Sequence, residues 1–166
     1  MRTGHTPSRT KPDYWDDVSI PWFTLADVWQ LREGHRYLGE TKELISPRGL
    51  QSSAAELLPE GTVVLSRTAS VGFTGIMPRP MATSQDFWNW VCGPRMLPTY
   101  LWYQLRAMNT EFDRLKSGST HKTIYQADAA ALRVVVPPIE VQRQIADYLD
   151  HETAEIDAFI ADLHAL

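Results

Sequence analysis

Two short polar segments carry side chains suited to contact an anion or the edge of a base. Residues 67–70 place an arginine beside hydroxyl groups, and arginine can fork onto guanine O6 and N7 or onto a phosphate. Residues 116–123 combine lysine, histidine and hydroxyl side chains, which suit phosphate contact. Gln85 can bind an adenine edge. The candidate residues of the two segments are Arg67, Thr68, Ser70, Lys116, Ser119, Thr120, His121, Lys122 and Thr123.

Each of these candidates also has a simpler interpretation. Residues 67–70 can form an exposed turn whose arginine binds nothing, and residues 119–123 can form a solvated serine-rich loop. Gln85 can pair with the backbone. Two arginines nearer the N-terminus, Arg36 and Arg48, complete the cationic candidates for nucleic-acid contact.

The sequence contains none of the common motifs of a catalytic or metal site. It has no Gly-x-x-x-x-Gly-Lys-Ser/Thr phosphate loop, no Gly-x-Ser-x-Gly elbow and no Cys/His cluster with zinc spacing. The Asn-Pro-Pro-Tyr type of motif that amino-methyltransferases use on a flipped base is also absent. We therefore expect no catalytic residue, no cofactor and no metal. A catalytic dyad assembled only by the fold stays open as an alternative.

The segments around residues 67–70 have the pattern of a β-hairpin. Residues 62–66 and 73–77 are largely apolar or β-branched, and each predicts a short strand. The tip of the hairpin would then present residues 67–70. Residues 82–92, with aromatic side chains for both faces, predict one further strand. Pro21 argues against a central strand near the N-terminus, because proline cannot donate to the ladder.

Helices are predicted before and after the second polar segment. Pro98 suits the first turn of a helix that ends before Gly118. Residues 53–56 have the serine and glutamate of a capping box and predict a short helix. Residues 132–136 predict a short buried strand. The buried stripe of the first helix would be Leu101, Leu105, Met108, Phe112 and Leu115.

Residues 139–166 have the spacing of a helix with a narrow apolar seam. Apolar side chains recur at steps of three and four, as at the a and d positions of a heptad, and acidic side chains occupy the other faces. A narrow seam favours pairing with one partner helix; the alternative is an amphipathic helix lying on its own domain. No Gly, Asn or Pro follows Leu163, so we expect a truncated helix. The seam residues are Ile145, Leu149, Ile156, Phe159, Leu163 and Leu166.

Composition and charge are those of one globular domain with an uneven charge distribution. Apolar residues make up 43% of the 166, and the single cysteine, Cys92, fits a reducing cytoplasm. The N-terminus lacks the apolar core of a signal peptide, and no apolar run approaches the roughly 18 residues of a membrane span. Residues 61–125 hold seven Lys/Arg and three Asp/Glu, whereas residues 126–166 hold two and eight. We expect a cytoplasmic protein without membrane contact, whose basic middle is a modest indication of an anionic partner.

Three motifs near the C-terminus follow one another in an order known from one family. They are Gly-Ser-Thr-His-Lys-Thr-Ile at 118–124, Val-Val-Val-Pro-Pro-Ile-Glu at 134–140 and Gln-Arg-Gln-Ile-Ala at 142–146. Upstream, the same order holds for Gly4 to Arg9, Ile20-Pro21-Trp22, residues 64–72 and residues 82–87. Together they resemble the specificity subunits of type I restriction-modification systems. The resemblance covers nearly the whole chain, and its specificity lies in the ordered set rather than in any one motif.

The resemblance implies a non-catalytic DNA-recognition subunit. Residues 1–136 would form a target recognition domain and residues 137–166 a spacer and dimerisation helix. We predict an α+β fold with a mostly antiparallel β core, flanking helices and a projecting C-terminal coiled-coil-type helix. The implied partners are double-stranded DNA, a methyltransferase subunit and, through the complex, a restriction subunit. We also expect self-association through the C-terminal helix.

Two other hypotheses belong to different classes. One is a protein-docking module that uses the seam helix and an aromatic surface without binding DNA. The other is a small enzyme. A full subunit of the family has two recognition domains, so the chain is either a fragment or a half-size subunit, and the recognised base sequence depends on loop geometry.

Overall fold

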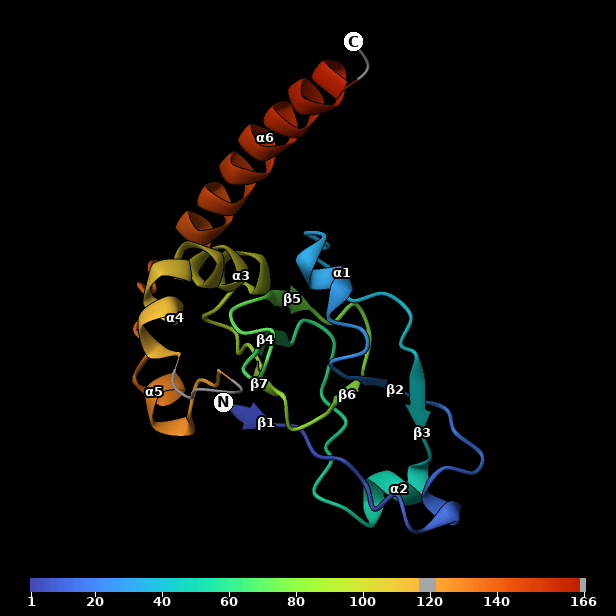
Figure 1. Cartoon of the computed structure of the whole chain (residues 1–166). Helices are drawn as coiled ribbons and strands as arrows, with labels where there is room; N and C mark the ends of the chain where they lie inside the picture. Colours follow the sequence, from blue (N-terminus) through green and yellow to red (C-terminus); the bar gives the residue numbers. More distant parts are fainter. Residues whose placement is uncertain (117–121, 165–166) are drawn as a thin grey trace.

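The computed structural model describes residues 1–116 and 122–164, which form two small sheets, flanking helices and one long projecting helix (Figure 1). The strands are β1 (Arg2–Thr3), β2 (Ile20–Phe23), β3 (Glu43–Ile45), β4 (Val63–Ser66), β5 (Thr74–Ile76), β6 (Ala82–Thr83) and β7 (Phe87–Trp90). The helices are the 3-10 turn η1 (Pro12–Tyr14), α1 (Trp29–Arg32), α2 (Pro47–Gln51), α3 (Pro98–Ala107), α4 (Asn109–Leu115), α5 (Gln126–Ala131) and α6 (Ile139–His164). The predicted α+β class is confirmed.

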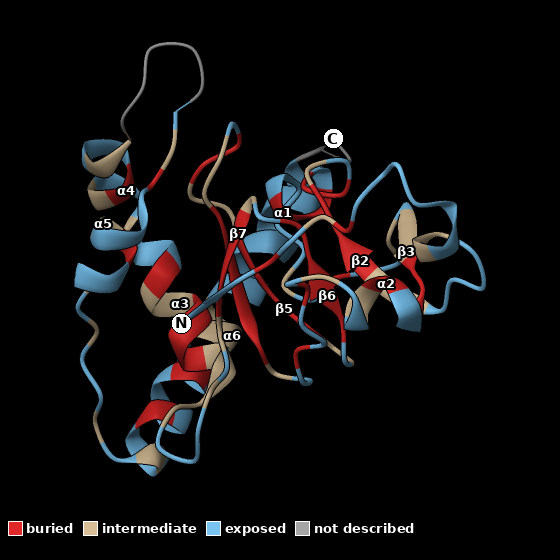
Figure 2. Cartoon of the chain, turned by 90° about the horizontal axis from the view of Figure 1, so that it is seen from below, coloured by how far each residue is buried: buried red, intermediate tan, exposed pale blue. Residues whose placement is uncertain are grey.

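The two sheets have short strands and mainly antiparallel pairing. The larger sheet has the order β1-β7-β4-β5 and is antiparallel throughout. The smaller sheet has the order β3-β2-β6, in which β2 is antiparallel to β3 and parallel to β6. Strand β4 is buried along its whole length. Strands β5, β6 and β7 are also largely buried (Figure 2). One face of the larger sheet packs on α3 and α4. A separate cluster of buried apolar side chains joins β2, α1, β4 and β7. Both sides of β4 are therefore in the core.

The predicted hairpin and most of the predicted helix stripe are confirmed. Strands β4 and β5 pair in antiparallel register, and residues 67–73 connect them. The helix predicted after Pro98 is two helices, because Met108 leaves the helical conformation with φ −90° and ψ 15°. The bend lets α4 turn inward and bury Phe112 beside Val71. Leu101 and Leu105 are buried on α3 as predicted.

Two predictions about individual strands were wrong. Residues 82–92 form β6 and β7 in different sheets, because residues 84–86 turn the chain and the Ser84 hydroxyl donates to Asp86 at 2.8 Å. Pro21 does lie in the central strand of its sheet, opposite Leu44. Proline removes one donor from a short ladder there, and the bond from Ser84 N–H to Phe23 O at 3.0 Å completes the strand's end.

Two other local predictions were also wrong. Residues 132–136 form no strand, and Val135 is 71% exposed. The next residues are Pro137 and Pro138, which have no N–H to give a ladder, while Tyr100 donates its hydroxyl to Val135 O at 3.1 Å. Residues 53–56 form no helix; the Ser53 hydroxyl only closes a turn by accepting the N–H of Ala55.

Helix α6 is confirmed, and it projects from the domain rather than lying on it (Figure 1). Its first turns pack on α3 through Gln142, which is 0% exposed, and Ala146. The Gln142 amide accepts the N–H of Leu97 at 2.9 Å and donates to the carbonyls of Arg95 and Pro137 at 2.8 Å each. One side chain thus joins the start of α3, the loop before it and the start of α6. Within residues 1–116 and 122–164, no helix is long and apolar enough to cross a membrane.

We predict that Gln142→Leu lowers the free energy of unfolding by about 1–3 kcal/mol, because it leaves a buried N–H and two carbonyls without their partner. Gln144→Leu, at an exposed position of the same helix, should change it by less than about 0.5 kcal/mol. Urea denaturation followed by circular dichroism compares the two variants. Equal unfolding midpoints would contradict the anchoring role of Gln142.

Candidate nucleic-acid interface

Backbone hydrogen bonds bring the two predicted polar segments together. Arg67 N–H donates to Asp86 O at 2.8 Å, and its own carbonyl accepts the N–H of Ile124 at 2.9 Å. Ala69 N–H donates to Lys122 O at 3.1 Å. An isolated antiparallel bridge pairs Thr68 with Thr123. The hairpin tip, the turn before β7 and the segment after residue 121 therefore meet in one place.

Arg67 is held in a fixed position at this meeting point. Its guanidinium carbon lies 4.2 Å from the centre of the Trp88 ring, which favours a cation–π interaction. The side chain is half-buried, and its Nε is buried without a partner among the described residues. Burial lowers the pKa of Arg67, and the charge of Asp86 opposes that shift. Arg67 is therefore stacked rather than loose, unlike the arginine of the exposed turn that was the alternative interpretation.

The other candidates of the first segment differ in exposure. Ser70 is buried, accepts a hydrogen bond from the Arg32 guanidinium and offers its carbonyl to the Ser66 hydroxyl, so it holds the loop. Thr68 is half-buried in the bridge to the second segment. Gln85 is exposed, and its side-chain oxygen accepts from the Thr6 hydroxyl at 2.5 Å.

The second segment is partly described. Lys122 is exposed, and Thr123 is half-buried opposite Thr68. Lys116 forms an ion pair with Asp113; that bond holds the pKa of Asp113 below its usual range, and the charge of Lys122 contributes. Three candidates, Ser119, Thr120 and His121, lie outside the described residues.

Arg36 and Arg48 lie away from the other candidates. Arg36 is beside the end of β5 that is farther from the tip, where its carbonyl accepts the N–H of Ile76 at 2.8 Å. Its guanidinium donates to both carboxylate oxygens of Asp150 on α6, once at 3.0 Å, and lies 4.7 Å from the centre of the Trp102 ring. Arg48 lies on α2 and pairs with Asp13 at 2.8 Å. These two arginines are engaged in contacts within the chain.

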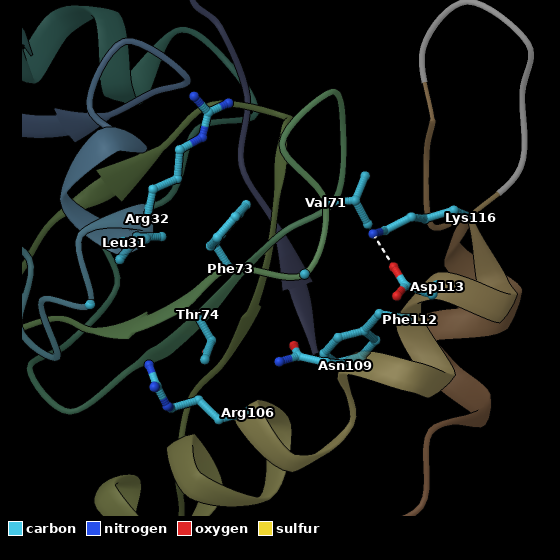
Figure 3. A pocket seen from close by; sticks show the side chains of 12 residues that line it. Leu31, Arg32, Val71, Phe73, Thr74, Arg106, Asn109, Phe112, Asp113 and Lys116 are labelled. Atoms are coloured by element: carbon cyan, nitrogen blue, oxygen red, sulfur yellow. Dashed lines mark hydrogen bonds and ion pairs between the residues drawn. The ribbon is translucent and has the colours of Figure 1, made fainter. Parts of the chain in front are cut away.

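A cavity of about 410 Å³ lies beside the hairpin tip and was not predicted. Arg32 of α1, Arg106 of α3 and Lys116 after α4 line it together with Asn109 (Figure 3). These residues are far apart in sequence and belong to different elements. Lys116 was a predicted candidate, but Arg106 lies in the middle of the predicted helix and no local pattern joins either residue with Arg32.

These observations define a class of structure. It is an α+β domain that has basic side chains at one hairpin tip and a helix that projects from the domain. Residues 1–161 match the family model described as the type I restriction modification DNA specificity domain. The chain belongs to this family. The family predicted from the ordered motifs is confirmed.

Individual relatives agree with this assignment. The specificity subunit of the type I restriction enzyme MjaIX from Methanocaldococcus jannaschii is 25% identical over 150 residues, which are 89% of this chain and 34% of that protein. The specificity subunit of the type I restriction enzyme EcoprrI from Escherichia coli is 33% identical over 87 residues, 52% of this chain and 20% of that protein. The crystal structure of the HsdS subunit from Thermoanaerobacter tengcongensis has the same fold, with a TM-score of 0.70 and 20% identity over 94% of this chain and 35% of that one. The chain spans about a third or less of the length of these relatives.

The Arg36–Asp150 pair predicts an acid-sensitive contribution to stability. Its hydrogen bond with Arg36 holds the pKa of Asp150 below its usual range, so the charged form stabilises the fold above a pH of about 4, and this contribution is lost as pH falls through the folded pKa. Asp150→Asn should lower the free energy of unfolding by about 0.2–1 kcal/mol at pH 7, since the pair is partly exposed. The difference from wild type should shrink at pH 3. Asp147→Asn, at an exposed position of α6, is the control, and a difference independent of pH would contradict the pairing.

Proposed function

We propose that this chain reads one part of a DNA target for a type I restriction-modification system and performs no chemistry itself. Methylation and cleavage would belong to a methyltransferase subunit and a restriction subunit that assemble with it. The family assignment supports a recognition role, and relatives that are named specificity subunits support the choice of system. The chain spans about a third or less of the length of these relatives, which suits a single recognition domain.

The observation that carries the proposal is the meeting of Arg67, Gln85 and Lys122 on segments tied by backbone bonds. Arginine and glutamine are the side chains that recognise guanine and adenine edges in the major groove, and an exposed lysine suits a phosphate. Stacking on Trp88 removes much of the conformational freedom of Arg67 before DNA arrives. Less entropy is then lost on binding, which favours a specific contact.

A selection from a pool of random duplexes tests DNA recognition directly. The full chain is immobilised and duplexes are recovered over several rounds at two salt concentrations, because phosphate contacts alone give salt-sensitive but unselective binding. We expect one short sequence to be enriched at both salt concentrations. Recovery of no duplex, or of an unenriched pool, would contradict the proposal and favour the docking module.

Arg67 is expected to read a base pair. Arg67→Ala should weaken binding to the selected duplex by about 1–3 kcal/mol and relax the preference at one base pair. Arg67→Lys keeps the charge but loses the planar fork, so it should not restore the preference. Anisotropy titrations against duplexes changed one pair at a time measure both effects. An equal loss for every duplex would make Arg67 a phosphate contact instead.

We further propose that the seam of α6 pairs with a second copy of this chain. The described seam residues beyond the anchored turns are unpartnered: Ile156 is 57% exposed and Phe159 64% exposed. Ile145 and Leu163 are also exposed, and Leu149 is half-buried. Leu166 lies outside the described residues. A stripe of this length on a projecting helix suits another helix of the same kind.

An antiparallel pair would place two recognition domains at opposite ends of the helices. That geometry suits a split DNA target with a fixed gap. Burial of one large apolar side chain contributes roughly 1.5–3 kcal/mol, so several of them can offset the cost of association. The acidic residues on the other faces of α6 would stay in water, and Glu152, which interrupts the seam, is half-buried.

Ile156→Asp should convert a dimer into a monomer, because it places a charge in the centre of the buried seam. Ala158→Asp adds the same charge at an exposed position off the seam and should leave the dimer intact. Sedimentation equilibrium at tens of micromolar distinguishes the two variants. This concentration range corresponds to an association free energy of about −6 kcal/mol. A monomeric wild type, or a dimer unaffected by Ile156→Asp, would contradict the pairing.

A further inference from the structure

Arg67 and Asp86 lie opposite each other where the two central strands of the larger sheet end. Strands β4 and β7 pair in antiparallel register as far as Ser66, which is opposite Phe87. The next pair in the same register is Arg67 with Asp86, and the bond from Arg67 N–H to Asp86 O at 2.8 Å continues the ladder to it. Side chains directly opposite each other in an antiparallel pair share one face, with Cβ atoms about 4.5–5.5 Å apart. An arginine and an aspartate therefore stand side by side at the hairpin tip.

The two charges are close together but do not form an ion pair. Burial lowers the pKa of Arg67 and the charge of Asp86 opposes that shift, which requires the two groups to be near each other. Both residues are described by the structure, and no ion pair joins them. The guanidinium lies instead over the ring of Trp88, two residues after Asp86 on the same face of β7. The tip thus presents a cation and an anion next to each other.

Ser84 fixes the carboxylate of Asp86. Its hydroxyl donates to Oδ2 of Asp86 at 2.8 Å, and its oxygen accepts the N–H of Asp86 at 3.3 Å. Ser84 is buried, and its own N–H donates to Phe23 O at 3.0 Å, so the turn is anchored in the smaller sheet. This turn needs only one carboxylate oxygen. The other, Oδ1, has no hydrogen bond within residues 1–116 and 122–164, and the side chain is only half-buried.

The pair of opposite charges is poorly suited to a phosphate. A carboxylate beside the arginine repels the negative oxygens of the DNA backbone and reduces the attraction that the arginine alone would exert. The edges of base pairs in the major groove, by contrast, present hydrogen-bond donors next to acceptors. A fixed donor beside a fixed acceptor therefore matches a base pair better than a phosphate.

We propose that Arg67 and Asp86 together read one G·C pair, in which Arg67 donates to N7 and O6 of guanine and Oδ1 of Asp86 accepts from the N4 amino group of the paired cytosine. A G·C pair presents two acceptors followed by one donor in the major groove, and O6 and N4 are neighbours because they bond to each other. An A·T pair would place the N6 amino group of adenine against the arginine and O4 of thymine against the carboxylate, and both contacts are repulsive. The inference rests on the proposed recognition of DNA and assigns the base pair read at the tip and a second residue that reads it.

Asp86→Asn removes the acceptor and keeps the shape of the side chain. The amide oxygen can take the hydroxyl of Ser84, which leaves an amide donor where Oδ1 of the carboxylate stood. In anisotropy titrations, the discrimination of the selected duplex against duplexes changed at this G·C pair should fall by roughly tenfold to a hundredfold, the usual effect of losing a hydrogen bond to a charged group. Binding to unselected duplexes should not weaken, since a charge that repels phosphate is lost. Asp147→Asn, which removes an exposed charge from α6, is the matched control and should keep the discrimination of wild type.

A modified base tests the same contact from the side of the DNA. The base 2-pyrimidinone lacks the N4 amino group of cytosine, so the wild type should bind a duplex with this replacement roughly tenfold to a hundredfold more weakly. Asp86→Asn has already lost the acceptor and should bind the two duplexes with similar affinity. The same replacement at a G·C pair outside the selected sequence controls for the weaker base pairing. Because the main comparison uses the wild type, it decides the proposal even if Asp86→Asn does not fold.

The outcomes separate this inference from the proposed function. A wild type that selects no duplex overturns both. A wild type that selects a duplex in which Arg67→Ala relaxes no G·C pair overturns the inference alone, and so does an unchanged affinity of the wild type for the 2-pyrimidinone duplex. An equal loss of affinity for every duplex in Asp86→Asn, with a lower midpoint of thermal unfolding, would make Asp86 a residue that only holds the turn and would also overturn the inference.

Discussion

The arrangement of the candidate site depends on a few backbone hydrogen bonds between distant segments. Arg67 is bonded through its N–H to Asp86 and through its carbonyl to Ile124, so one residue joins three parts of the chain. Ala69 adopts a φ of 59° in the same tip, a conformation that costs roughly 1–2 kcal/mol for a residue with a Cβ. The bond from its N–H to Lys122 O offsets that cost. Without these bonds, the basic side chains of the tip and of the later segment would not share a face.

A second constraint is the polar anchoring of α6. Gln142 satisfies three backbone groups at the base of the helix, and Arg36, Tyr103 and Asp150 form a hydrogen-bonded cluster two turns further along. Hydrogen bonds are directional, so they define the angle at which the helix leaves the domain more closely than apolar contacts would. The apolar seam is consequently not used to hold the helix on its own domain. It stays available along the projecting part of α6.

These two constraints relate local contacts to the proposed recognition of DNA. The tip holds Arg67 where three segments of the chain meet, which would fix the position from which it reads a base pair. The anchored helix would set the direction in which a second domain lies. A buried tryptophan supports the tip in two ways: Trp88 carries Arg67 on its ring and donates its indole N–H to Ile124 O at 3.1 Å.

Local and periodic features of the protein were determined by its sequence alone. The β4–β5 hairpin, the stripe with Leu101 and Leu105, and the seam of α6 follow from residue types at short spacing, since side-chain periodicity directly reflects helix and strand geometry. The ordered motifs were enough to identify the family. What only the tertiary structure decided involves partners far apart in the chain. Arg36 pairs with Asp150, Ser70 is buried and bonded to Arg32, residues 82–92 divide between two sheets, and Arg32 and Arg106 line one cavity. No local pattern encodes these arrangements. Such contacts depend on how the elements pack together, and a sequence pattern read over a few turns does not contain that information.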